Sequence, residues 1–202
     1  MKLIVMTQPT FFVEEDKILT SLFDEGLESL HLYKPGASPM YSERLLSLIP
    51  NEYYDKITVQ DNYYLKDEYK LRGIHIDDEE TAAPKGYKGH LSRTCTRLDK
   101  LKTAKRNADY VLLKYIFGSQ TEADRKASFT LDELREASLR GLIDRHVYAL
   151  GGMALDNIRM ARELGFGGVV ISGDLWNRFD IHQQCDYQTL IDHFVKLRKA
   201  CQ

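Results

Sequence analysis

The chain alternates short apolar runs with longer segments in which apolar residues recur every three or four positions. Eight of the short runs are rich in apolar residues, and several are continuously apolar, which is typical of parallel strands covered on both faces. The expected strands are Lys2–Met6, Ser29–Leu32, Lys56–Gln60, Gly73–Ile76, Tyr87–Leu91, Tyr110–Leu113, His146–Leu150 and Gly168–Ser172.

The longer segments carry the spacing of amphipathic helices. Glycines such as Gly26, Gly141 and Gly165 lie at the ends of three of them, where a helix is expected to stop. The expected helices are Glu14–Glu25, Tyr41–Ile49, Thr96–Arg106, Leu131–Leu142, Leu155–Leu164 and Tyr187–Leu197.

Repeated strand–helix units without a Pro/Ser-rich linker predict a single α/β domain over residues 1–202. Eight strands in 202 residues fit a small (β/α)8 TIM barrel. An open doubly wound sheet is the alternative, but the first strand is followed by MTQPTFF, which has no glycine. The Pro-containing segment Asp77–Gly86 is too short for a full helix, so a reduced helix is expected after the fourth strand.

Composition narrows the function classes. The formal charge is −2 with no basic stripe, which argues against nucleic acid and favours a small-molecule partner. The apolar run in MKLIVM is too short for a signal sequence or a membrane span. Cys95, Cys185 and Cys201 are scattered, which is typical of reduced thiols in a cytoplasmic protein.

Two loops have the composition of a phosphate site. Gly151 and Gly152 follow the seventh strand, and Ser172 and Gly173 follow the eighth. Barrel enzymes often bind phosphate between these two loops through backbone N–H groups. A tight turn is the alternative for Gly151 and Gly152. If the pair binds phosphate, a bulky residue at position 152 should weaken ligand binding much more than stability.

Acidic residues follow the third and fourth strands. Asp61 comes directly after one, and the run from Asp77 to Glu80 comes directly after the next. Carboxylates on neighbouring loops can hold Mg²⁺ together with substrate phosphate. A solvated acidic turn is the alternative.

Other polar residues lie near predicted strand ends. His31, Tyr33 and Lys34 can face a substrate, whereas His75, between two isoleucines, is expected to be a hydrogen-bonded core residue. Ser92 and Arg93 are expected at the mouth of the fifth strand, as anion ligands or helix caps. The long segment after the sixth strand is either a lid or a spacer; its polar residues are Lys114, Tyr115, Ser119, Thr121, Arg125 and Lys126.

Five motifs along nearly the whole chain resemble the thiamine phosphate synthase family, which includes the thiazole tautomerases. GIHIDDEE stands where the family has GVHI/LGQxD, GHLSRTCT near G-x-S-x-H-T, and ADYVLLKYIF near ADYV-x-x-GPIF. VYALGGMALDNI is similar to V-x-A-IGGI-x-x-xN, and GFGGVVISGDLW to GADGVAVVSAI. The family has a small (β/α)8 barrel, in agreement with the strand count.

The resemblance implies an activity and a site. The synthase joins hydroxymethylpyrimidine diphosphate to thiazole phosphate and releases diphosphate with Mg²⁺. Asp61 and Glu80 take the two metal positions, and Lys34, Tyr115 and Ser92 are the expected catalytic residues. The expected substrate-binding residues are His31, Tyr33, Gln60, Arg93, Ser119, Thr121, Gly151, Gly152, Ser172 and Gly173.

Several positions depart from the family pattern. His31–Pro35 stands where the synthase has Q-x-R-x-K, which removes its Gln and Arg and puts Lys34 one place early. Gln60 replaces an Asn, Glu122 replaces the lid lysine, and Tyr115 stands where the tautomerase has its catalytic His. Candidate substitutes for the missing cations are Lys34, Arg93, Arg125 and Lys126.

Four functions therefore stay open. The favoured one is a thiamine-biosynthesis transferase. The others are a metal-independent, tautomerase-like enzyme, a non-catalytic phosphate-ligand-binding barrel, and another phosphosugar isomerase on the same fold. Barrels of this family commonly pair, so a homodimer is an option.

Overall fold

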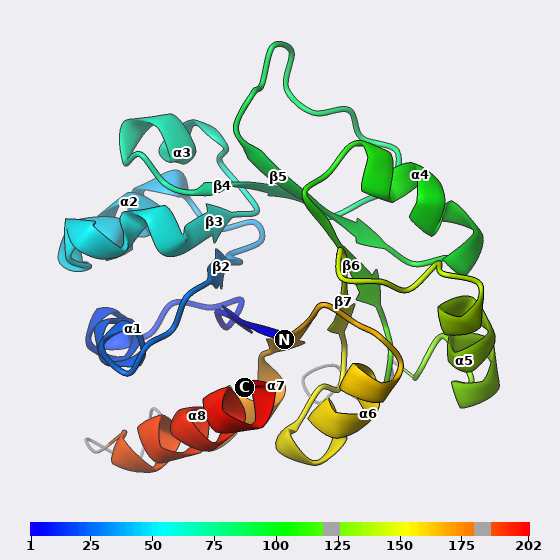
Figure 1. The fold of residues 1–202 in the computed structure, drawn as a ribbon. Coiled ribbons are helices and arrows are strands. Elements are labelled where there is room, and N and C mark those ends of the chain that lie inside the picture. Colours follow the sequence, from blue (N-terminus) through cyan, green and yellow to red (C-terminus); the bar gives the residue numbers. More distant parts are fainter. Residues whose placement is uncertain (119–125, 180–186) are drawn as a thin grey trace.

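Eight parallel strands pair in chain order, and β8 pairs with β1, so the sheet closes into a barrel (Figure 1). This computed structural model describes residues 1–118, 126–179 and 187–202. The predicted (β/α)8 fold is confirmed. The strands are β1 (Lys2–Met6), β2 (Leu30–Leu32), β3 (Ile57–Val59), β4 (Gly73–Ile76), β5 (His90–Cys95), β6 (Tyr110–Lys114), β7 (Val147–Leu150) and β8 (Gly168–Ile171).

Helices surround the barrel on its outside (Figure 1). The α-helices are α1 (Glu15–Asp24), α2 (Pro39–Leu48), α3 (Tyr64–Glu68), α4 (Leu101–Arg106), α5 (Leu131–Leu139), α6 (Ile158–Glu163), α7 (Gly173–Trp176) and α8 (Gln188–Cys201). Short 3-10 turns are η1 (Asn51–Lys56), η2 (Leu98–Lys100) and η3 (Leu155–Asn157). The short helices α3 and α7 were not predicted, because neither is long enough to show a helical period.

The connection between β4 and β5 contains no helix across residues 77–89, all of which the structure describes. In Figure 1 it extends as a long loop from the barrel rim. This confirms the reduced unit predicted after the fourth strand.

The position of the fifth strand was predicted wrongly. It was expected at Tyr87–Leu91 but runs from His90 to Cys95, so Ser92 and Arg93 lie inside the strand and not at its mouth. Ser92 and Thr94 are polar but buried, because each hydroxyl has a hydrogen-bond partner inside the barrel. A polar barrel interior hides the strand from a hydrophobicity pattern.

Alternation along the strands produces two separate apolar clusters. The larger lies between the barrel and its helices and includes Val5, Leu30, Ile74 and Phe194. The smaller lies inside the barrel and is formed by Ile4, Met6, Tyr110, Leu112, Leu150 and Val170, from β1, β6, β7 and β8. The buried polar residues that face the barrel interior from β2 to β5 and the position after β3 are His31, Thr58, Gln60, His75, Ser92 and Thr94. One half of the barrel interior is therefore apolar and the other half polar.

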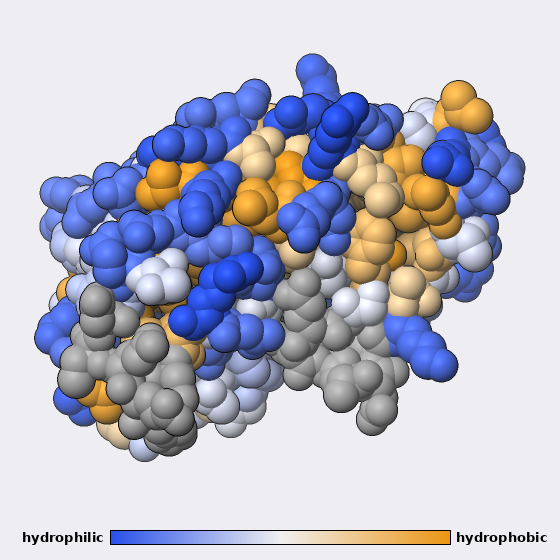
Figure 2. Space-filling model, turned by 90° about the horizontal axis from the view of Figure 1, so that it is seen from below, coloured by the Kyte–Doolittle hydropathy of each residue, from blue (hydrophilic) through white to orange (hydrophobic). Residues whose placement is uncertain are grey.

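The surface seen from below Figure 1, on the side of α6 and α8, is mostly polar with apolar residues gathered mainly on one half (Figure 2). None of the helices in the described part of the chain has the length and apolar content needed to span a bilayer. Cys95 and Cys201 are buried with free thiols, and Cys185 lies outside the described residues.

Candidate active site

A cavity of about 160 Å³ opens at the carboxyl ends of the strands. This is the end at which TIM barrels carry their active sites. Its lining comes from seven of the eight strands or the residues directly after them: Met6, Thr7, Pro9, Tyr33, Gln60, Asp77, Lys114, Tyr115, Leu150, Gly151, Gly152, Met153, Val170, Ser172 and Gly173.

One wall of this cavity is the pair of loops after β7 and β8. Gly151 and Gly152 have φ values of +99° and +63°, in the region that favours glycine. A Cβ on Gly152 would lie 2.7 Å from Cβ of Phe117 and would also collide with the carbonyl oxygen of Gly118. The backbone itself thus requires glycine here, and substitution is expected to cost stability as well as ligand binding, contrary to the expectation from sequence.

The N–H groups of Gly152 and Met153 donate to no acceptor within the described residues. Ser172 and Gly173, on the next loop, line the same cavity. Bare N–H groups beside a serine and a glycine form a wall that can accept an anion. The structure therefore brings the four predicted phosphate-binding residues together.

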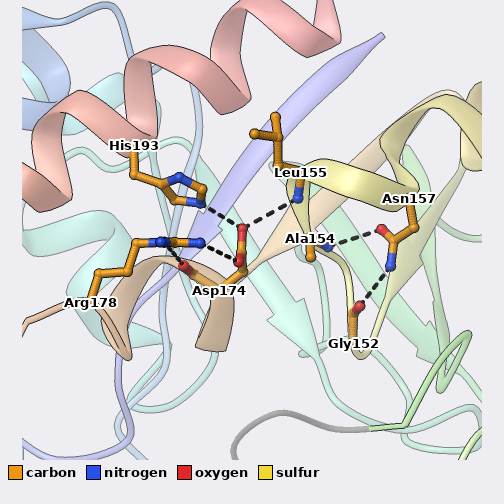
Figure 3. A network of polar contacts seen from close by, with 7 residues as sticks. All are labelled: Gly152, Ala154, Leu155, Asn157, Asp174, Arg178 and His193. Carbon is orange, nitrogen blue, oxygen red and sulfur yellow. Dashed lines mark hydrogen bonds and ion pairs between the residues drawn. The ribbon is translucent and has the colours of Figure 1, made fainter.

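A polar network fixes these two loops to each other and to α8 (Figure 3). The carboxylate of Asp174 accepts a hydrogen bond from Nε2 of His193 at 2.7 Å and one from the N–H of Leu155 at 3.3 Å. Arg178 donates to the same carboxylate at 3.2 Å. Asn157 completes the loop after β7, because its Nδ2 donates to the carbonyl of Gly152 at 2.9 Å.

The opposite wall carries an acid and a base. Nζ of Lys114, the last residue of β6, lies 3.6 Å from Oδ2 of Asp77, which follows β4. Burial acts to lower the pKa of Lys114, but Asp77, Tyr115 and Tyr33 outweigh it, so the pKa is raised and the ammonium stays charged.

Asp77 is held by a chain of hydrogen bonds that continues into the barrel interior. Thr94 donates its hydroxyl proton to Oδ1 of Asp77 at 2.6 Å, so its oxygen must accept from Nε2–H of His75 at 2.9 Å. Nδ1 of His75 then accepts from Ser92 at 2.8 Å. Burial lowers the pKa of His75 to about 3, helped by Lys114 and Arg93, so the ring is neutral and this tautomer is fixed. His75 is a hydrogen-bonded core residue, as predicted.

A second buried chain supports Gln60. Its Nε2 lies 3.0 Å from Nδ1 of His31, and Nε2 of His31 lies 2.6 Å from the hydroxyl of Tyr110. Burial holds the pKa of His31 well below its usual range and raises the pKa of Tyr110 to about 12. The ring of His31 is therefore neutral, and its Nδ1 accepts a hydrogen bond from the side-chain amide of Gln60.

One carboxylate suited to a divalent cation directly follows Gln60, although Asp61 itself is not among the residues that line the cavity. Oδ2 of Asp61 is buried without a hydrogen-bond partner among the described residues. Burial raises the pKa of Asp61, and the negative charge of Asp77 raises it further. Glu80 lines a different hollow with Arg93, Lys100 and Asn107.

No cluster of three or more His, Cys, Asp or Glu side chains suited to a metal occurs in the described ranges. Mg²⁺, however, is commonly held by only one or two carboxylates plus phosphate oxygens. Asp61 and Asp77 are near enough for the charge of Asp77 to raise the pKa of Asp61, so these two carboxylates are the candidate pair.

The structure brings together only some of the predicted site residues. Tyr33, Gln60 and Tyr115 line the cavity together with Gly151, Gly152, Ser172 and Gly173. Ser119, Thr121 and Arg125 lie outside the described residues, and Lys126 is exposed and does not line the cavity.

Besides Asp61 and Glu80, four predicted residues lie outside the cavity lining. Ser92 and His31 are fully buried inside the barrel, where they support His75 and Gln60. Lys34 is buried in an ion pair with Glu15 at 2.6 Å, and Arg93 donates to the carbonyl of Thr81. These side chains do not line the cavity, because each is bonded to a partner that lies away from it.

Sequence reasoning did not single out Lys114 and Asp77 as a pair. Lys114 is the last residue of β6 and Asp77 is the first residue after β4, and each lies two residues beyond an inward-facing residue, Leu112 or His75. Continuing the alternation to these two positions would have placed both side chains in the cavity.

Two comparisons agree with this architecture. A family model described as thiamine monophosphate synthase matches residues 42–175. The structure is similar to a thiamine phosphate pyrophosphorylase from Bacteroides thetaiotaomicron, with 46% identity, a TM-score of 0.90, and coverage of 99% of this chain and 97% of that one.

A second solved structure, a thiamine phosphate pyrophosphorylase from Pyrococcus furiosus, has 20% identity and a TM-score of 0.72, and the match covers 99% of this chain and 95% of that one. At that identity it supports the fold alone. No curated protein sequence matches the chain. The family match, the 46% relative and the closed barrel together show that this chain belongs to the thiamine monophosphate synthase family.

Proposed function

We propose that the chain is a thiamine-biosynthesis transferase that moves a hydroxymethylpyrimidine group from its diphosphate ester to thiazole phosphate and releases diphosphate. The observation that carries this proposal is the division of one cavity into a wall with the N–H groups of Gly152 and Met153, unpaired among the described residues, and an opposite wall with Lys114 and Asp77. A reaction between two phosphorylated substrates needs two anion sites. The family membership supports the same reaction.

The loops after β7 and β8 are suited to thiazole phosphate. The N–H groups of Gly152 and Met153 and the side chain of Ser172 can bind phosphate oxygens without carrying a charge themselves. The hydrogen bond from the N–H of Leu155 to the carboxylate of Asp174 joins the two loops to each other. The phosphate is thus an anchor that orients the thiazole ring toward the apolar side chains of Met6 and Leu150.

The opposite wall is suited to the diphosphate ester. As the carbon–oxygen bond of the ester breaks, its electron pair leaves with diphosphate while the new bond to thiazole forms. Asp61 and Asp77 would hold Mg²⁺, which would supply positive charge for the departing diphosphate. Gln60 uses its Nε2 on His31, so its carbonyl oxygen is left to accept from the pyrimidine.

Diphosphate release tests this proposal directly. The purified chain is incubated with both substrates and Mg²⁺, and diphosphate and thiamine phosphate are measured together. We expect equal amounts of both products and no release when either substrate is omitted. A lack of turnover beside an active control synthase would contradict the proposal.

A second candidate function is a thiazole phosphate tautomerase. Tyr115 lines the cavity, at the position where the tautomerase carries its catalytic His, and its ring lies 5.1 Å from Nζ of Lys114. A phenol beside an ammonium is suited to proton transfer. This function predicts proton exchange into a thiazole carboxylate phosphate without metal, slowed in Tyr115→Phe.

A thermal-stability measurement beside the two tests identifies a barrel that binds thiazole phosphate without catalysis. Such a chain would gain thermal stability from thiazole phosphate but turn over neither substrate set. Stabilisation by thiazole phosphate without turnover in either test would therefore exclude both proposed activities.

A further inference from the structure

Lys114 is the one basic side chain that lines the cavity, counting residues 1–118, 126–179 and 187–202. The motif comparison places Lys114 where the family pattern ADYV-x-x-GPIF has its glycine. Asp77 likewise stands at the glycine after GVHI/L in GVHI/LGQxD. An ion pair therefore replaces two glycines at the rim of the same cavity.

This replacement coincides with the loss of other cations. The Arg of Q-x-R-x-K is absent, Lys34 is buried against Glu15, and Arg93 lies against Thr81 outside the cavity. A diphosphate that enters the cavity meets no other basic side chain in the part of the chain that the structure describes.

Lys114 is not hydrogen-bonded to Asp77, because their 3.6 Å separation is longer than a hydrogen bond. Its hydrogen-bond partner at the cavity is Tyr115, a neutral group that leaves the ammonium charge available to an anion. By contrast, Asp77 is fixed, because Thr94 donates to its other oxygen at 2.6 Å. The Lys114 side chain is only 20% exposed, which reduces solvent screening of its charge.

We propose that Lys114 is the residue that binds the diphosphate group of the substrate, with Asp77 holding its ammonium at the cavity rim until the anion arrives. The proposal rests on the synthase function. It adds a cation in place of the one that the family pattern has and this chain lacks. Lys114 contacts the anion directly, and Asp77 acts as a positioning residue.

Inorganic diphosphate is the probe, and its binding is measured by calorimetry with Mg²⁺ present. Lys114→Met is expected to weaken binding about 10- to 100-fold, the loss of one charge-assisted hydrogen bond, and Lys114→Arg to retain part of it. Lys102→Met, on the exposed face of α4, is the matched control and should bind as the original chain does. Circular dichroism and melting temperature establish that each variant is folded.

Compared with Lys114→Met in the absence of Mg²⁺, because Asp77 is also proposed to hold the metal, the double variant Asp77→Asn/Lys114→Met separates anion binding from charge balance. If Lys114 only neutralises Asp77, the double variant regains diphosphate affinity, and the proposal is overturned. If Lys114 binds the anion, affinity stays low. Lys126→Met gives a further arm: a loss there with none in Lys114→Met would assign the cation to Lys126 and overturn the proposal.

The same variants keep this inference distinct from the synthase function. Diphosphate binding that depends on Lys114 without turnover of the two substrates would contradict the function and support the anion site. Turnover with an unchanged KM for the diphosphate ester in Lys114→Met would support the function and overturn the inference. Absence of diphosphate binding in the original chain would also overturn it.

Discussion

Nζ of Lys34 lies 2.6 Å from Oε1 of Glu15, and both side chains are almost entirely out of solvent, at 2% and 1% exposure. Lys34 also donates to the carbonyl of Thr10 at 2.9 Å and lies 4.4 Å from the ring centre of Phe11. The second carboxylate oxygen of Glu15 has no hydrogen-bond partner among the described residues. This ion pair joins the start of α1 to the segment after β2, so its role is structural.

Glu15 has a pKa of about 7 against an ordinary 4.5, because burial outweighs the opposing effect of Lys34. The folded state therefore holds this proton more tightly than the unfolded state. The contribution of Glu15 to stability is complete below pH 4.5 and is lost as pH rises toward 7.

Lys34→Met should therefore be strongly pH-dependent. At pH 8 it leaves a buried carboxylate unpaired, at a cost of about 3–5 kcal/mol in the free energy of unfolding. At pH 5 the carboxyl is protonated in the folded variant and the loss is smaller. Urea unfolding at both pH values measures the difference.

Lys17→Met is the matched control on the same helix. Lys17 pairs with Glu14 at the same 2.6 Å, but its side chain is 59% exposed, so its removal should change stability little at either pH. Loss of turnover in Lys34→Met at unchanged stability would contradict the structural role and restore Lys34 as a catalytic residue.

Gly152→Ala should destabilise the fold by several kcal/mol, because a Cβ there meets Phe117 and Gly118 at a φ of +63°. Gly141 has a φ of +68° with open space around it, so Gly141→Ala should cost only about 1–2 kcal/mol, the penalty of the left-handed conformation. The difference between the two variants, measured by urea unfolding, is the cost of the close packing. Equal losses would show that this contact does not limit the loop.

Asp174→Ala should lower both stability and affinity for thiazole phosphate. The carboxylate accepts from His193, Leu155 and Arg178, and its loss leaves a nearly buried imidazole without its partner, at about 1–3 kcal/mol. Melting temperature and calorimetric affinity measure the two effects. Asp132→Ala is the control, because Asp132 also pairs with an Arg in the first turn of a helix but is 91% exposed; it should change neither quantity.

Asp61→Asn and Glu80→Gln test the metal ligands. Asp61 has the orphaned buried oxygen, whereas Glu80 lines a separate hollow. Asp61→Asn should raise the Mg²⁺ concentration needed for half-maximal turnover by about tenfold or more, a change comparable to losing one metal ligand or its support. Glu80→Gln should leave that concentration unchanged. A larger effect in Glu80→Gln would return the second metal position to the one that the family resemblance implied.

The barrel was predictable because its strands pack outward against helices. Residues such as Leu30, Ile74 and Val111 are apolar for that reason, and their runs mark the strands. That the loops after β7 and β8 line one cavity was predictable as well, since these two loops are neighbours in any such barrel.

The rest of the site depends on pairs that sequence distance conceals. Lys34 is directed away from the cavity by Glu15, 19 positions earlier, and Ser92 is drawn into the barrel by His75, 17 positions away. Local pattern shows neither partner. Which charged side chain reaches a cavity is decided by where its counter-ion lies, and that became visible only with the closed sheet.

In β2 to β5 the apolar side chains face the helices and polar side chains face the barrel interior. The strand register is therefore itself part of substrate selection. A one-residue insertion in β4 would exchange Ile74 and Ile76 for His75 and Asp77, turning ionisable groups toward the helices and isoleucines toward the substrate. Substitutions at alternate positions carry no such penalty. Related barrels are therefore free to change ligands by replacing inward residues such as Lys114, while the length of each strand stays fixed.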